Sequence, residues 1–401
     1  MSIFVLTASQ VATPTELLED AFVVVDGTKV REVGSGQPPE GALELVRLGN
    51  LLVAPGFIDV HVHGGGGHDV NRPSPEEAAA AAREVARYHA GHGTTSLLAT
   101  TVSDSTEVLL AAVAGIASVA REAGSGILGA NLEGPWLSPV RAGAQFPGAL
   151  RLPSLRELDD LLEQADGTLR MLTLAPELPG AMDVVTAATH AGITVSVGHT
   201  DADYATAKAA FDAGARHVTH LFNGMPPLHH RRPGPAGAAL EDPRVCVELV
   251  CDGVHVHPAV ISIVSSLASE RLALVTDAIG PAGAPPGRYK LGPTDVIVSE
   301  ERAQLADGSG TIAGSVLTMD RAVGFAVKSA NVGLLPALQA ASLNPATALG
   351  EKAKGRLAAG SDADFVVLDD ALRAVATVVA GRVVHDPRGL LAALPFSQRA
   401  K

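Results

Sequence analysis

The chain is poor in the residues that build disulfide frameworks or stack on nucleic-acid bases. Its two cysteines, Cys246 and Cys251, lie five positions apart in a predicted strand, so their side chains point to opposite faces and are poorly placed to bridge each other. One Trp, three Tyr and nine Phe among 401 residues leave few rings on which bases could stack. We therefore expect neither a disulfide scaffold nor a single-stranded nucleic-acid groove.

Positive charge and long apolar runs are also scarce. Thirty basic residues against 43 acidic ones give a net charge of -13, which disfavours nucleic acid and anionic membrane as partners. A secretory signal requires a basic segment followed by an apolar one, and residues Met1 to Asp20 lack this pattern. The longest nearly apolar run, Val108 to Ala120, is shorter than the ~20 residues of a membrane-spanning helix. These features predict a soluble, cytoplasmic protein.

What the chain does contain begins with two similar stretches at its opposite ends. Residues Ala21 to Val33 and Phe365 to Val384 both show β-branched residues on either side of turn residues, which is typical of β-hairpins. They predict a small β-sandwich domain built from residues 1–53 and 356–401, which encloses a second domain of residues 54–355. The alternative is that the two hairpins are unrelated.

Between these stretches, short apolar runs alternate with Ala-rich segments of helical length. The predicted strands are Leu51–Asp59, Thr94–Thr100, Ile127–Leu132, Leu169–Ala175, Ile193–Gly198, His217–Leu221, Val245–Cys251 and Leu272–Thr276. The predicted helices include Pro75–Gly91, Ser103–Ala123, Ser154–Gln164, Gly180–Gly192 and Ala202–Gly214. This alternation predicts the α/β class and a (β/α)₈ barrel of the TIM type, whose chemistry takes place at the carboxyl ends of the strands.

Five of the predicted strands lead directly into imidazole or carboxylate side chains. In chain order these are His61 and His63 after the first strand, Glu133 after the third, His199 after the fifth, His220 after the sixth and Asp277 after the eighth. Any one of them could be a satisfied histidine or a capping carboxylate. Because all of them end strands of one barrel, together they predict a metal site.

The ligand types indicate which metal fits. Imidazole and carboxylate without thiolate suit Zn²⁺, our first choice, with Fe²⁺, Co²⁺ and Mn²⁺ as alternatives. Glu133, His199 and His220 form a three-ligand set that leaves a position for water, whereas His61 and His63 complete a second set that Glu133 would bridge. Whether one or two ions bind stays open at this point.

Asp277 is placed to take a proton from metal-activated water and to pass it to a leaving group. This predicts hydrolysis of an amide-like or ester-like bond. The alternative role for Asp277 is that of a further metal ligand.

Other features concern a substrate. The loop Asn223 to Gly234 is strongly basic and suits a phosphate or carboxylate, unless it is a solvated surface loop. Asp252 and His255 follow the seventh strand, which would aim His255 into the same mouth. Glycines in Gly310 to Ser315 allow the backbone to approach a ligand, although a tight turn explains them equally well.

These motifs, taken in order, resemble the N-acetylglucosamine-6-phosphate deacetylases of the amidohydrolase superfamily. The resemblance covers nearly the whole chain. It is carried by Pro55–Gly64, Leu132–Pro135, Val197–Thr200, Thr219–Met225, Asp252–His255, Val275–Ala278, Gly314–Asp320 and the tail motif Gly360–Val366.

The resemblance implies a reaction in amino sugar metabolism, the removal of acetate from a 2-acetamido sugar 6-phosphate. It implies that Glu133, His199 and His220 hold the catalytic metal, and that His61 and His63 supply a second site found in some members. Asp277 would act as base and then acid. The implied substrate contacts are Ala144, Gln145, Asn223, Gly224, Arg231, Asp252, His255, Ile312, Ala313 and Gly314. Arg231 would reach into the neighbouring subunit of a homodimer.

One position departs from the family pattern. Members usually carry a Gly-Ala-His run whose histidine helps to polarise the scissile carbonyl, but here the run is Gly143-Ala144-Gln145. Either Gln145 does this more weakly with help from a second metal, or the substrate has changed, because glutamine cannot become cationic. Alternative substrates are N-acetylgalactosamine 6-phosphate, an unphosphorylated amino sugar and an N-acyl amino acid. A non-catalytic sugar-phosphate sensor is the alternative outside the enzymes.

Overall fold

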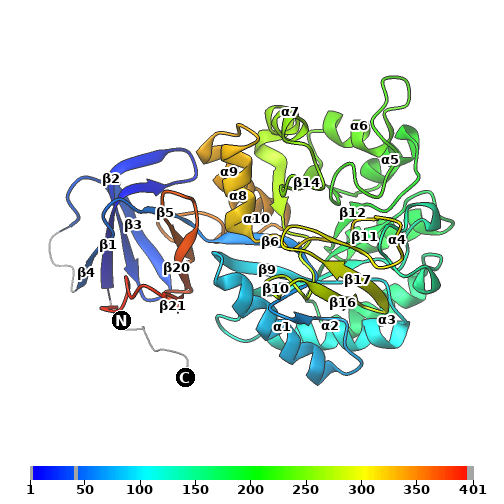
Figure 1. Ribbon diagram of the computed structural model, residues 1–401, viewed down its shortest axis with the longest axis horizontal. Helices are drawn as coiled ribbons and strands as arrows, with labels where there is room; N and C mark the ends of the chain where they lie inside the picture. Colours follow the sequence, from blue (N-terminus) through cyan, green and yellow to red (C-terminus); the bar gives the residue numbers. More distant parts are fainter. Residues whose placement is uncertain (1–2, 40–43, 395–401) are drawn as a thin grey trace.

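Eight parallel strands form the central sheet of the computed structural model, which describes residues 3–39 and 44–394 (Figure 1). Each strand pairs with the one that follows it in the chain. A hydrogen bond also joins the first and last strands and so closes the barrel, since Asp277 N donates to His61 O at 2.9 Å. The strands are β6 (Phe57–Val62), β9 (Thr94–Thr101), β10 (Ile127–Glu133), β11 (Leu169–Leu174), β12 (Thr194–Val197), β13 (His217–Val218), β14 (Cys246–Val250) and β15 (Leu272–Val275). The predicted (β/α)₈ barrel is confirmed.

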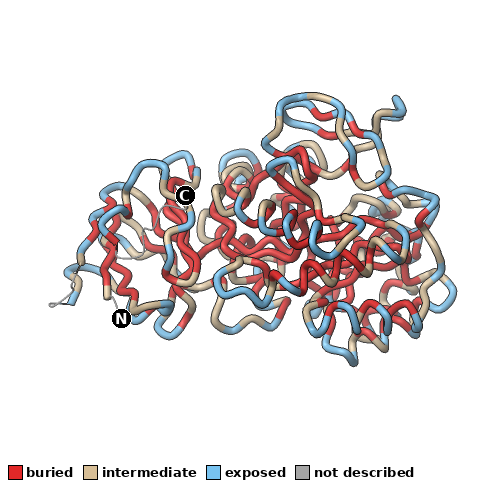
Figure 2. The backbone as a smooth tube through the Cα atoms, turned by 90° about the horizontal axis from the view of Figure 1, so that it is seen from below, coloured by how far each residue is buried: buried red, intermediate tan, exposed pale blue. Residues whose placement is uncertain are grey.

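Helices surround the barrel strands, and the buried residues concentrate in the strands at the centre (Figure 2). Ser74, Ser105 and Ser154 cap the first three helices by accepting a hydrogen bond from a backbone N–H of the first turn. The helices are α1 (Pro75–Ala90), α2 (Thr106–Ala120), α3 (Leu155–Ala165), α4 (Ala181–His190), α5 (Tyr204–Asp212), α6 (Gly234–Glu241), α7 (Pro258–Ala268), α8 (Met319–Lys328), α9 (Leu334–Ala340) and α10 (Leu343–Ala348). The first five coincide with the predicted helical segments.

A second eight-stranded sheet joins the two ends of the chain. Its strands are β1 (Ile3–Ala12), β2 (Leu17–Asp26), β3 (Lys29–Ser35), β4 (Glu44–Arg47), β5 (Leu52–Pro55), β19 (Phe365–Leu368), β20 (Ala374–Val379) and β21 (Arg382–His385). Two branches leave β1, one through β4 and one through β5, and both contribute residues to one apolar cluster. The predicted sheet-rich domain of both termini is therefore present. Figure 1 shows it at one end of the molecule, beside the barrel.

Two strand predictions in this region were wrong. Leu51–Asp59 is not one strand, because the chain leaves the terminal sheet and enters the barrel at Gly56, where a Cβ would lie 2.1 Å from Thr95 Oγ1. The expected boundary between residues 53 and 54 thus falls inside β5, and both domain boundaries stay a prediction. Phe365–Val384 is not a single hairpin but three strands, because Asp369 accepts hydrogen bonds from Ala371 N and Arg373 N in an extra turn.

The sixth barrel strand is also shorter than predicted. His217–Leu221 was expected, but β13 ends at Val218, and His220 and Phe222 have φ of 27° and 78° in the turn that follows.

Two small sheets complete the structure: β16 (Gly287–Leu291), β17 (Thr294–Val298) and β18 (Ala303–Leu305) form one, and β7 (Gly64–Gly65) and β8 (His68–Asp69) the other. The three-stranded one is an insertion after the eighth barrel strand, and none of its strands had been predicted.

Cys246 and Cys251 are both buried free thiols, in agreement with the expected absence of a bridge. None of the helices in the described part of the chain is long and apolar enough to cross a membrane. The cytoplasmic location stays a prediction.

Candidate active site

The predicted histidines and carboxylates meet at the carboxyl ends of five barrel strands. They follow or end β6, β10, β12, β13 and β15, and all are buried: His61, His63, Glu133, His199, His220 and Asp277. Three of them, His199, His220 and Asp277, have positive φ values of 44°, 27° and 50°. Such backbone is costly for residues with a Cβ and is typical of functional sites. Here hydrogen bonds to the backbone oxygens maintain it, for example from Ser315 N to Asp277 O at 2.7 Å.

Glu133, His199 and His220 form the first ligand set. Glu133 Oε1 lies 3.2 Å from His199 Nε2 and 3.1 Å from His220 Nε2, and the two Nε2 atoms are 3.1 Å apart. Ligands on a tetrahedral ion with bonds of ~2.1 Å are about 3.4 Å apart. The three atoms therefore have close to the spacing that a single Zn²⁺-sized ion requires.

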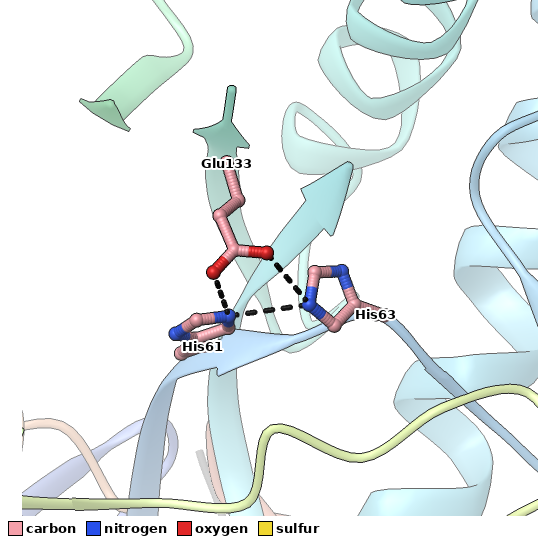
Figure 3. Close-up of side chains that lie close together, drawn as sticks. All are labelled: His61, His63 and Glu133. Carbon is pink, nitrogen blue, oxygen red and sulfur yellow. Dashed lines mark hydrogen bonds and ion pairs between the residues drawn. The ribbon is translucent and has the colours of Figure 1, made fainter. Parts of the chain in front are cut away.

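His61, His63 and Glu133 form the second ligand set (Figure 3). The two Nε2 atoms are 3.2 Å apart, and they lie 3.4 Å and 3.3 Å from Glu133 Oε1 and Oε2. Glu133 thus faces both sets, as the sequence predicted for a bridging carboxylate. Figure 3 shows its two oxygens directed at the two rings, one near the end of β6 and the other directly after it.

The outer ring nitrogens indicate that the inner ones carry lone pairs. His61 Nδ1 faces Glu248 Oε2 at 3.0 Å, His63 Nδ1 faces Thr100 O at 3.2 Å, and His199 Nδ1 faces Arg141 O at 2.8 Å. A carbonyl or carboxylate oxygen only accepts, so each Nδ1 carries a proton. In the neutral rings each Nε2 then holds a lone pair, and two lone pairs 3.2 Å apart need a cation or a proton between them. This donor set fits a divalent ion.

The electrostatics of the ion-free site point the same way. Burial disfavours a charged imidazole, but the carboxylates of Glu133 and Glu248 outweigh it and raise the pKa of His61 to about 10. Against the same burial, hydrogen bonds to Asp277 and Glu133 raise the pKa of His63 to about 9. Burial would also raise the pKa of Glu133, but the imidazoles around it hold that pKa well below its usual range. The site therefore attracts positive charge, which an ion or protons can supply.

Asp277 lies beside the second set. Its Oδ1 is 3.2 Å from His63 Nε2 and 3.6 Å from His61 Nε2, and its Oδ2 is 4.0 Å from His255 Nε2. Burial would raise the pKa of Asp277, but the hydrogen bond and charge of His63 lower it. Asp277 is therefore a carboxylate at neutral pH, able to accept a proton or an ion.

A cavity of about 360 Å³ opens over both ligand sets. Seven of the ten predicted substrate contacts line it: Ala144, Gln145, Asn223, Gly224, His255, Ile312 and Gly314. Arg231, Asp252 and Ala313 do not. Asp252 Oδ2 lies 2.7 Å from His255 Nδ1 and so orients that ring, whereas Ala313 is fully buried. Arg231 is exposed. None of the residues His229 to Arg232, the basic part of this loop, lines the cavity of its own chain.

Gln145 is bound at both ends of its amide. Its Nε2 donates to Glu133 Oε2 at 2.5 Å and its Oε1 accepts from Ser103 N at 2.7 Å. One N–H of the amide remains for a ligand in the cavity. Gln145 therefore contacts the shared carboxylate directly, a role that the sequence did not predict.

Three further residues were missed. Arg302, at the edge of the inserted small sheet, is the one Arg or Lys among the described residues that line the cavity. Glu248 and His217 lie behind the ligands, with Glu248 Oε1 2.9 Å from His217 Nε2. The sequence did contain a signal for this pair: Glu248 lies inside the apolar strand Cys246–Val250, and a carboxylate buried there needs a polar partner.

Comparison with known proteins gives a consistent answer. A model of the amidohydrolase family matches residues 52–385. An N-acetylglucosamine-6-phosphate deacetylase from Bos taurus is 40% identical over 84% of both chains. An N-acetylgalactosamine-6-phosphate deacetylase from Escherichia coli O157:H7 is 40% identical over 80% of this chain and 84% of its own.

Solved structures agree with these relatives. The N-acetyl-D-glucosamine-6-phosphate deacetylase from Mycobacterium smegmatis superposes with a TM-score of 0.90 at 42% identity, and covers 95% of this chain and 100% of its own. The family match spans the barrel strands that carry both ligand sets. This chain therefore belongs to the amidohydrolase family.

Proposed function

We propose that the chain hydrolyses the acetamide of N-acetyl-D-glucosamine 6-phosphate, giving D-glucosamine 6-phosphate and acetate. The observation that carries this proposal is the convergence of four histidine Nε2 atoms and Glu133 beside Asp277, at the floor of one cavity. Relatives at 36–42% identity that are named for this reaction support the substrate. The linear amide C–N bond is the one that breaks.

The amidohydrolase superfamily is metal-dependent, and the two ligand sets suit a divalent ion. We assign Glu133, His199 and His220 to a catalytic ion, Zn²⁺ before Fe²⁺, Co²⁺ or Mn²⁺, and His61 and His63 to a second. When bound, the ion polarises the acetamide carbonyl and lowers the pKa of water near it.

Asp277 is the proposed general base and acid. Its carboxylate accepts a proton from the water that attacks the carbonyl carbon, and it delivers that proton to the nitrogen as the C–N bond breaks. The low pKa of Asp277, caused by the hydrogen bond and charge of His63, keeps the carboxylate ready for the first transfer.

The cavity wall is the proposed sugar-phosphate site, and seven of the ten predicted contacts line it. His255, oriented by Asp252, supplies a polar group to the same cavity that the inserted small sheet lines. Arg231 is exposed in its own chain, which is compatible with a homodimer in which Arg231 completes the site of the partner. We propose that assembly together with the function.

A second candidate is deacetylation of N-acetylgalactosamine 6-phosphate, because the relative of that name is as similar to this chain as the glucosamine enzyme. The two substrates differ at one hydroxyl. A direct comparison of acetate release from both epimers and from unphosphorylated N-acetylglucosamine, by purified zinc-loaded protein, tests both proposals. Preferred turnover of N-acetylglucosamine 6-phosphate is expected. Absence of acetate release from all three, with metal bound, would overturn them.

A further inference from the structure

Glu248 is a completely buried carboxylate in the middle of β14, behind the floor of the cavity. Its exposed fraction is 0%, and its neighbours in the strand, Val247 and Leu249, are apolar and equally buried. A buried carboxylate is strongly disfavoured unless charges and hydrogen bonds compensate it. The partners of Glu248 therefore indicate what the charge is for.

Glu248 contacts both ligand sets. Its Oε2 lies 3.0 Å from His61 Nδ1 and accepts a hydrogen bond from His220 N at 3.0 Å, and its Oε1 lies 2.9 Å from His217 Nε2. The carboxylate thus holds the ring of one ligand and the backbone of another. It touches neither the cavity nor the ligand atoms that face it.

The contact with His61 decides what that ring can bind. Because a carboxylate accepts from Nδ1–H, the lone pair of His61 is placed on Nε2, which points at Glu133 and His63. Such a carboxylate behind a histidine ligand also raises the basicity of the ring and fixes its orientation. His63, in comparison, is held from behind by the neutral carbonyl of Thr100.

We propose that Glu248 is a positioning residue that orients the His61 ring, so that the affinity of the His61–His63–Glu133 set for its ion depends on the Glu248 carboxylate. The inference goes beyond the proposed function, but it rests on the metal dependence of that function. The expected effect of its loss is selective: the second ion is lost, while the Glu133–His199–His220 set keeps its own.

The test is a count of bound ions in the full chain. Wild-type protein and Glu248→Gln are equilibrated at defined free Zn²⁺ concentrations, and bound zinc per chain is measured by elemental analysis. Wild type should bind two ions, and Glu248→Gln should bind the second about 10- to 100-fold more weakly. A wild type that saturates at one ion overturns the proposal, even if the variant fails to fold. A folded Glu248→Gln with wild-type affinity for both ions overturns it as well.

Two controls separate positioning from general disturbance of the core. Thr173→Val removes an equally buried hydroxyl, bonded to Thr219 Oγ1 at 2.8 Å, from the same barrel and should keep both ions. Glu248→Asp keeps the charge and should bind the second ion more tightly than Glu248→Gln. Loss of the second ion in Thr173→Val, or equal affinities in Glu248→Asp and Glu248→Gln, would overturn the proposal. Acetate release is scored separately, so that two bound ions without turnover would count against the proposed function alone.

Discussion

Gln145 ties the shared carboxylate of Glu133 to the loop after β9, since its amide donates to Glu133 Oε2 at 2.5 Å and accepts from Ser103 N at 2.7 Å. Hydrogen bonds to charged groups contribute about 1.5–3 kcal/mol. Gln145→Leu, of similar size, should therefore weaken ion binding or lower kcat/KM by about 10- to 100-fold, measured by zinc titration and acetate release. Gln339→Leu, which loses a hydrogen bond to Pro14 O far from the cavity, is the control. Unchanged ion affinity and kcat/KM in Gln145→Leu would contradict this role.

Asp277→Asn should strongly reduce turnover while the protein still binds its substrate. An amide cannot accept the proton of the attacking water, and general acid–base groups contribute roughly 10²–10⁴-fold to rates. We expect kcat for acetate release to fall by that factor, with calorimetric binding of the substrate retained. Asp242→Asn is the control, since Asp242 is also buried but pairs with Lys208 and Arg244. A kcat for Asp277→Asn within tenfold of wild type would argue for a ligand role of Asp277 instead.

Ion binding should tighten as the pH rises. In the ion-free protein the surrounding carboxylates outweigh burial and raise the pKa of His61 to about 10 and that of His63 to about 9. Below these values a proton occupies each Nε2 and competes with the ion, and above them it does not. The apparent zinc affinity should increase from pH 6.5 to about 9 and level off near 10, with protons released on binding. Isothermal titration in buffers of different ionisation enthalpy measures both. An affinity independent of pH over this range would show that these rings do not bind the ion.

Arg302→Ala should affect phosphorylated substrates selectively. Arg302 is the one Arg or Lys among the described lining residues, and its side chain makes one hydrogen bond there, from Nη2 to Gly310 O at 3.1 Å. Its other N–H groups suit a phosphate. We expect KM for N-acetylglucosamine 6-phosphate to rise about 10-fold, with kcat/KM for the unphosphorylated sugar unchanged. Arg288→Ala, on β16 of the same inserted sheet but outside the cavity, is the matched control. Equal losses for both sugars would indicate a structural role for Arg302.

The proximity of the proposed ligand residues was predictable because the barrel converts sequence order into closeness in space. Each of them directly follows an apolar run, so that knowledge of the strands and of their common direction was enough to bring Glu133 and His220 together. Glu248 and His217 were not predictable as partners of the ligands, since their contacts depend on the packing of the barrel interior. Arg302 was missed because it belongs to an insertion that has no place in the alternation of strands and helices.

The strand boundaries could not be predicted from the sequence for a different reason. Gly56 separates β5 from β6 because Thr95 leaves no room for a side chain, and that contact lies 39 positions away in sequence. The apolar pattern of Leu51–Asp59 continues through the break. Periodicity therefore identified the right residues as extended but assigned them to one sheet instead of two.

The inserted sheet β16–β18 has a consequence for how this enzyme family can diversify. It reaches the cavity wall through Leu291 and Arg302, whereas the ions would be held by the barrel strands alone. The substrate contacts proposed for the insertion and the proposed hydrolytic residues thus lie on separate pieces of chain, while Asn223 and His255 line the cavity from barrel loops. Replacement of this insertion could redirect the enzyme to another acylated compound without any change to the groups that cleave it.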